Sequence, residues 1–121
     1  MRLPRRAHLL LDERGIPTGA TEGAPGEADP IASRTFDDLY ALGRTHDLAF
    51  AADNGAAIEL RCGAGYPYAQ VWVPKGRSFG ALEPMTAPTN ALENDGAPLV
   101  SPGDAFTATF TLVVTAPGSS A

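Results

Sequence analysis

The sequence has few of the residues that build disulfides, metal sites and nucleic-acid surfaces. Cys62 is the only cysteine, which excludes an intrachain disulfide and a cysteine-based metal site and favours a cytoplasmic location. The two histidines, His8 and His46, lack the spacing of a metal-binding pair, so we expect no metal. The chain has 9 Lys and Arg against 14 Asp and Glu, and its net charge of −5 argues against a nucleic-acid partner.

Long apolar segments are absent as well. No run of 18 apolar residues occurs, so we expect no membrane span. The apolar run at residues 7–11 is too short for a signal peptide and is followed at once by Asp12 and Glu13, so we interpret it as a strand. No phosphate-binding loop and no nucleophile-elbow motif is present, and we expect no cofactor.

The sequence does contain short apolar segments separated by turns that are rich in its 13 Gly and 11 Pro. This pattern predicts an all-β protein, an antiparallel β-sandwich, with one domain at residues 1–116 and a flexible tail at 117–121. We expect strands at residues 7–12, 47–53, 56–62, 68–73, 79–83 and 104–115. Residues 36–42 are the best helical candidate, residues 19–33 are expected to form a long loop, and residues 84–101 should be irregular.

The last predicted strand has the clearest alternation. Apolar side chains occupy every second position from 106 to 114, and threonines occupy most of the positions between them. The apolar face consists of Phe106, Ala108, Phe110, Leu112 and Val114. We expect this face to belong to the core.

Two neighbouring strands carry the candidate binding residues. Tyr68, Gln70 and Trp72 share one face, and an amide between aromatic rings suits a sugar, although a half-exposed aromatic stripe has the same pattern. If the turn at residues 74–78 joins antiparallel neighbours, Glu83 falls within about one residue of Gln70. A carboxylate there is a candidate general base, and the alternative is a solvated Glu at a strand end.

Asp47 begins another predicted strand, on a face that it shares with Ala49 and Ala51. Small alanine side chains leave space beside the carboxylate, which could then accept hydrogen bonds from ligand hydroxyl groups. The outer face of an edge strand is an equally good interpretation.

The segment FGALEPMTAPTNAL (residues 79–92) resembles the late signature of aldose 1-epimerases, in which a Glu-Pro-Met-Thr segment carries the catalytic base. Four further segments are similar to that family in the same order: LDERGIPTG (11–19), HDLAF (46–50), PYAQVWVP (67–74) and SPGDAFTATFTLVV (101–114). The resemblance implies part of a galactose mutarotase-like supersandwich and a small aldose, of the glucose or galactose class, as substrate. It implies that Glu83 is the base and that Asp47, Gln70 and Trp72 bind the sugar.

The sequence also departs from the family. Leu48 follows Asp47 where members often have a histidine, and the chain is similar only to the C-terminal portion of the family. The catalytic histidine of the family, which protonates the ring oxygen, has no counterpart. We therefore expect weak or no epimerase activity from this chain alone, with either a missing N-terminal half or self-association through exposed sheet edges. A non-catalytic carbohydrate-binding β-domain is the alternative.

Overall fold

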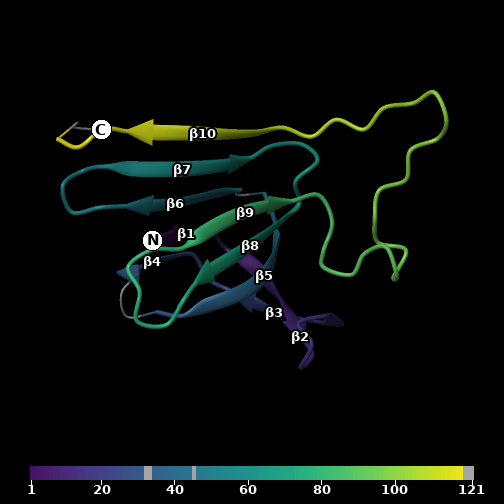
Figure 1. The fold of residues 1–121 in the computed structure, drawn as a ribbon, viewed down its shortest axis with the longest axis horizontal. Coiled ribbons are helices and arrows are strands. Elements are labelled where there is room, and N and C mark those ends of the chain that lie inside the picture. Colours follow the sequence, from purple (N-terminus) through teal and green to yellow (C-terminus); the bar gives the residue numbers. More distant parts are fainter. Residues whose placement is uncertain (32–33, 45, 119–121) are drawn as a thin grey trace.

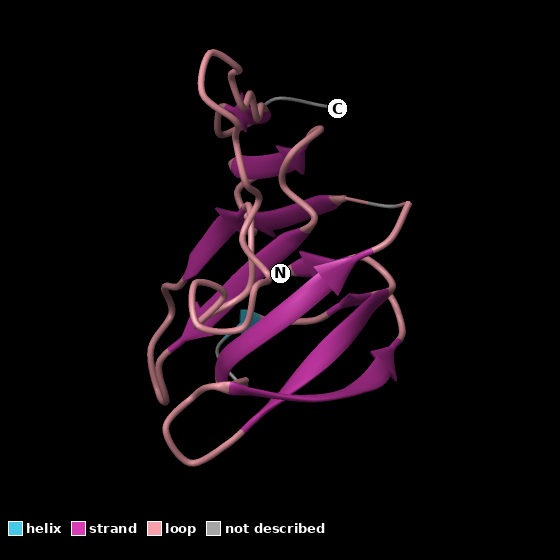
Figure 2. Ribbon diagram, turned by 90° about the vertical axis from the view of Figure 1, so that its right-hand side faces the viewer, coloured by secondary structure: helices cyan, strands magenta, loops and turns pink. Residues whose placement is uncertain are grey.

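The computed structural model describes residues 1–31, 34–44 and 46–118. In this part of the chain there is no α-helix, and the strands form two antiparallel five-stranded sheets (Figures 1 and 2). The expected all-β, sandwich-like architecture is confirmed. Among the described residues, no helix is long and apolar enough to cross a membrane.

The strands of the two sheets are interleaved along the sequence. The first sheet has the order β10 (Phe110–Thr115), β7 (Ala57–Cys62), β6 (Asp47–Ala51), β1 (Arg2–Leu3) and β4 (Glu27–Ala28). The second has the order β3 (Pro17–Ala24), β2 (Arg6–Leu11), β5 (Phe36–Leu42), β8 (Tyr68–Val73) and β9 (Ala81–Met85).

The core lies between the facing sides of the two sheets. Ala69, Val71 and Val73 alternate along β8 and are fully buried, as the sequence predicts for this face. Leu48 and Leu60 contribute to the same core from the first sheet. Complete burial of one such aliphatic side chain stabilises the fold by about 1.5–3 kcal/mol.

The prediction of a helix at residues 36–42 is wrong, because this segment is β5. It is the middle strand of its sheet and pairs with β2 on one side and β8 on the other. Phe36 and Tyr40 point into the core, while Leu39 is buried on the opposite face. Apolar residues on both faces hide the period of two and imitate a helical spacing.

The long loop predicted at residues 19–33 is also wrong over most of its length. β3 covers residues up to Ala24 and pairs with β2, and the short β4 pairs with β1. β3 is an edge strand whose side chains are nearly all exposed, so it forms without the apolar alternation that identifies buried strands. Residues 32 and 33 lie outside the described residues.

The predicted hairpin between β6 and β7 is confirmed. The Ala52 N–H donates to the Ala56 carbonyl oxygen at 2.8 Å, and Gly55 supplies a positive φ of 87° in the turn. β8 has the predicted bounds, whereas β9 begins at Ala81 rather than at residue 79. The irregular segment predicted at 84–101 begins after Met85.

The prediction for the closing strand holds only in part. Strand pairing begins at Phe110, not at residue 104, and the apolar face is not core: Phe110, Leu112 and Val114 are 43%, 53% and 74% exposed. β10 is the edge strand of the first sheet and lies at the end of the molecule farthest from β2 and β3 (Figure 1). Alternation predicts which residues share a face, but it does not say whether another layer covers that face.

The predicted tail is anchored at its start. The Gly118 N–H donates to the Asn54 carbonyl oxygen at 2.8 Å, which holds residues 117 and 118 against the β6–β7 turn. Residues 119–121 lie outside the described residues.

Candidate functional site

Three polar side chains from adjacent strands meet on the outer face of the second sheet. Gln70 on β8 lies directly opposite Glu83 on β9, within the one-residue margin expected from the sequence. On the other side, the Gln70 Nε2 group donates to the Asp37 Oδ1 atom of β5 at 2.9 Å. We call Asp37, Gln70 and Glu83 the carboxylate–amide cluster.

The cluster lines a cavity of about 290 Å³. The remaining lining residues come from the second sheet and its flanking turns: Leu11, Gly15, Met85 and Thr89. Two carboxylates and an amide oxygen present mainly hydrogen-bond acceptors, which match a ligand with several hydroxyl donors. The volume lies at the small end of the range for ligand pockets.

Trp72 lies on the same face of β8 as Gln70, but it does not line the cavity. Its side chain is 39% exposed, and its ring centroid is 6.0 Å from that of Phe79 at an interplanar angle of 54°. Tyr68, two residues before Gln70, is half-buried. The predicted alternation of aromatic and amide side chains along this face is therefore present.

Asp47 is not brought together with Gln70 and Glu83. It lies on β6 in the first sheet, directly opposite Arg61 on β7. Arg61 also donates to the Glu59 carboxylate at 2.6 Å. Burial, and secondarily the negative charge of Asp47, raises the pKa of the Cys62 thiol.

Neither histidine lines the cavity that contains Glu83. His8 lies on the inner side of the second sheet, where its Nε2 atom is 3.6 Å from Asp38 Oδ1. The Tyr40 hydroxyl donates to the other Asp38 oxygen at 2.8 Å, and burial raises the pKa of Tyr40 to about 12. His46 precedes β6, and its carbonyl oxygen accepts from the Cys62 N–H at 3.1 Å.

Asp37 is the cluster member that the sequence did not single out. The helix predicted at residues 36–42 would not have placed it beside Gln70, because only strand pairing aligns β5 with β8. The available signal was the pair Asp37-Asp38 inside an apolar segment, which is unusual for a buried strand. Among residues 1–31, 34–44 and 46–118, no group of three or more His, Cys, Asp or Glu could hold a metal ion.

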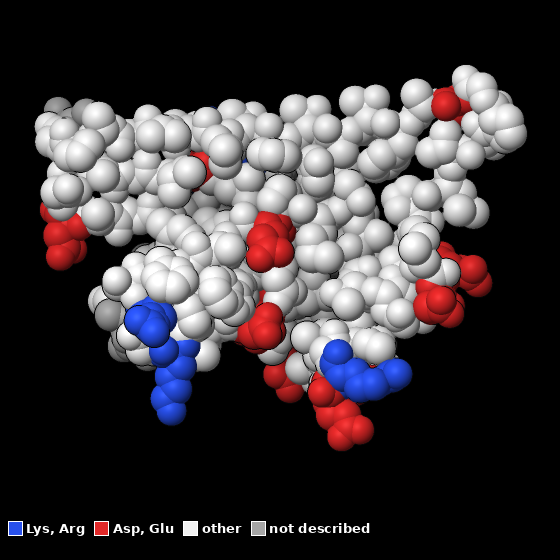
Figure 3. Space-filling view, viewed as in Figure 1, with Lys and Arg blue, Asp and Glu red and all other residues white. Residues whose placement is uncertain are grey.

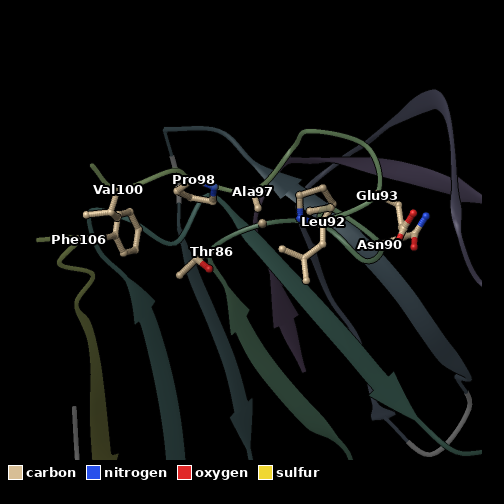
Figure 4. Close-up of a pocket in the computed structure, with 11 residues that line it drawn as sticks. Thr86, Asn90, Leu92, Glu93, Ala97, Pro98, Val100 and Phe106 are labelled. Carbon is tan, nitrogen blue, oxygen red and sulfur yellow. The ribbon is translucent and has the colours of Figure 1, made fainter. Parts of the chain in front are cut away.

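Two larger hollows lie away from the cluster. One, of about 610 Å³, is an open hollow lined by the loop between β9 and β10, with Val100 and Phe106 at one end and Asn90 and Glu93 at the other (Figure 4). The other, of about 820 Å³, includes Phe50, Phe79 and Val114 in its lining. Both are mainly apolar; the first has Asn90 and Glu93 in its lining, and the second has a single carboxylate, Asp53.

The molecule is thus a sandwich-like all-β protein with a carboxylate–amide cluster on the outer face of one sheet. No protein-family model, no curated protein and no solved structure matches the chain.

Proposed function

We propose that the carboxylate–amide cluster is the base half of an aldose 1-epimerase site and that the two sheets are part of a galactose mutarotase-like supersandwich. The substrate would be a free aldose of the glucose or galactose class. The observation that carries the proposal is the direct pairing of Gln70 with Glu83, inside the Glu-Pro-Met-Thr segment that resembles the family signature.

The reaction needs proton transfers only. Glu83 takes the proton of the C1 hydroxyl group, and the electron pair of that O–H bond forms the C1 carbonyl. The bond between C1 and the ring oxygen breaks, and the ring oxygen takes up a proton. Rotation about the bond between C1 and C2, followed by the reverse steps on the other face of C1, gives the opposite anomer.

Gln70 and Asp37 have positioning roles in this scheme. The 2.9 Å hydrogen bond fixes the Gln70 amide, so that its oxygen is directed away from Asp37 and is free to accept from a sugar hydroxyl. Trp72 and Phe79 lie farther along the same face and would contact the C–H groups of the sugar.

The acid half of the pair is not beside Glu83. No histidine lines the cavity, so the proton for the ring oxygen would come from water in this chain alone. A positioned acid contributes roughly 10²–10⁴-fold to a rate, and its loss leads us to expect weak acceleration.

A non-catalytic carbohydrate-binding role is the second candidate. One observation favours it: Trp72 and Phe79 form an exposed aromatic pair, 39% and 54% accessible, on the face that carries Gln70. Such a pair can stack on the apolar face of a sugar without any proton transfer.

The deciding experiment is polarimetry of freshly dissolved α-D-glucose and α-D-galactose with the wild-type chain, Glu83→Gln and Glu22→Gln. The last variant is a matched control, because Glu22 is an exposed carboxylate on the edge strand β3 of the same sheet. Binding is measured separately by NMR titration with methyl β-galactoside, which cannot change its anomeric form.

We expect a weak acceleration that Glu83→Gln abolishes and Glu22→Gln retains. Binding of the glycoside without any acceleration would replace the epimerase proposal with the carbohydrate-binding one. If the chain neither accelerates mutarotation nor binds the glycoside, both proposals are wrong.

A further inference from the structure

Among the described residues, none forms a layer opposite part of the inner face of the first sheet. β10 pairs with β7 in full register, so Phe110, Leu112 and Val114 lie opposite Cys62, Leu60 and Ile58 and share their inward-facing side. Ile58, Phe110, Leu112 and Val114 are nevertheless 40–74% exposed. We call these four residues the uncovered face.

The uncovered face borders a groove beside the edge strand of the second sheet. The groove has a volume of about 180 Å³ and is lined by Phe50, Ile58, Leu60, Gly80, Leu82 and Leu112. Leu82 belongs to β9, which is an edge strand, and Gly80 immediately precedes the first residue of β9. None of the described residues that line this groove is charged.

β10 itself is an edge strand without the usual protection against pairing. Its sequence, FTLVVT, contains no charged residue and no proline, and β7 occupies only one of its two sides. Natural edge strands are usually shortened, charged or interrupted by proline, because an unprotected edge pairs with other chains. Pro84 gives β9 one such interruption, whereas β10 has none.

We propose that the uncovered face is the interface of a two-fold symmetric dimer of this chain. In this dimer β7 and β10 of each copy cover the uncovered face of the other, and the partner's β10 lies alongside β9. Each copy then supplies the layer that the other lacks, so the contact is closed and does not propagate into a fibre.

A second copy fits because the uncovered apolar face lies on a pair of strands, β7 and β10, and a pair of apolar strands is the kind of layer needed to cover it. A half-exposed aliphatic or aromatic side chain leaves on the order of 50 Å² of apolar area in water, so the four residues of the uncovered face leave roughly 200 Å² per copy. A stable interface buries about 800 Å² per partner, with an apolar centre and a polar rim. The uncovered face has the size of such a centre, and the flanking strands and loops supply the rim.

The charge distribution agrees with this assignment. The band formed by β10 carries few charged side chains in Figure 3, and the Lys, Arg, Asp and Glu side chains in that view lie mainly over the second sheet. The two copies would meet through a surface that carries few charged side chains in this view. Because each copy has a net charge of −5, added salt should strengthen the association.

Sedimentation equilibrium over a range of concentrations tests the proposal with the wild-type chain, Leu112→Glu and Thr111→Glu. Positions 111 and 112 are adjacent and exposed on β10 but point to opposite faces, so the two variants add the same charge to different sides of one strand. Val114→Glu is a second interface variant at a position that is 74% exposed and so tolerates a charge in the monomer. Circular dichroism checks that each variant is folded.

We expect a wild-type dimer whose dissociation constant rises tenfold or more in Leu112→Glu and Val114→Glu and changes by less than about threefold in Thr111→Glu. A wild-type chain that stays monomeric at all concentrations would overturn the proposal. Equal weakening by Thr111→Glu would also overturn it, because the contact would then not depend on the inner face of β10.

Discussion

Replacing Gln70 with Glu places a third carboxylate between Asp37 and Glu83 and tests the geometry of the cluster directly. The variant loses the 2.9 Å hydrogen bond from the Gln70 amide to Asp37 and adds like charges on both sides. We expect it to be less stable than the wild type at pH 7. We also expect the pKa of the carboxyl group at position 70 to be raised by its two negative neighbours.

The size of the effect follows from exposure and distance. Glu83 lies directly opposite position 70, where Cβ atoms are about 5 Å apart, and Asp37 is a diagonal neighbour, opposite Trp72 but within hydrogen-bond reach of the side chain at position 70. Two unit charges about 4 Å apart in water repel by about 1 kcal/mol. Asp37 and Glu83 are exposed, so the value for water applies, and the two neighbours together cost about 2 kcal/mol. The lost hydrogen bond costs about 1 kcal/mol more.

Gln70→Met is the matched control, because it loses the hydrogen bond without adding charge. Urea unfolding at pH 7 should show Gln70→Glu to be about 2 kcal/mol less stable than Gln70→Met. A carboxyl group whose pKa is raised in the folded state lowers the stability only at pH values above its unfolded pKa of about 4. The difference in stability between the two variants should therefore vanish near pH 3. Equal stability of the two variants at pH 7, or a difference independent of pH, would refute the proximity of the three side chains.

Three further predictions concern the framework of the fold. Gly80→Ala should destabilise the protein by about 1–3 kcal/mol in urea unfolding, because the new Cβ atom would meet the Trp72 carbonyl oxygen at 2.5 Å. Arg6→Met should cost about 1–3 kcal/mol in the same assay, because it leaves the Pro4 and Pro25 carbonyl oxygens without their guanidinium donor and removes the 3.3 Å ion pair with Glu27, which keeps Arg34 as a partner at 3.0 Å; no loss would contradict a structural role for Arg6. Ultraviolet titration should show Tyr40 ionising near pH 12, and because its raised pKa favours the protonated folded state, the stabilisation is complete below pH 10 and lost as the pH rises to about 12.

The parts of the fold that could be predicted are those where one face is buried and a turn has an unambiguous sequence. β8 alternates strictly, and the Asp53-Asn54-Gly55 turn fixes the β6–β7 hairpin. β5 could not be recognised, because apolar side chains such as Leu39 occupy both of its faces. β3 could not be recognised for the opposite reason, because an exposed edge strand has no apolar pattern at all.

The candidate site shows the same division. Glu83 and Gln70 could be placed side by side, because a short turn fixes the register of consecutive strands. Asp37 joins them through the pairing of β5 with β8, two strands separated by the β6–β7 hairpin, and such long-range pairing has no local signal. The position of Asp47 in the other sheet is likewise a property of the topology rather than of its own segment.

The epimerase and dimer proposals share β9 but depend on opposite faces of it. Along this strand Leu82 points inward, toward the groove beside Leu112, and Glu83 points outward, toward Gln70. Because adjacent residues of a strand face opposite sides, a charge at position 112 leaves the cluster untouched, and Glu83→Gln leaves the groove untouched. A dimer without sugar chemistry would therefore refute only the epimerase proposal. An active monomer would refute only the dimer.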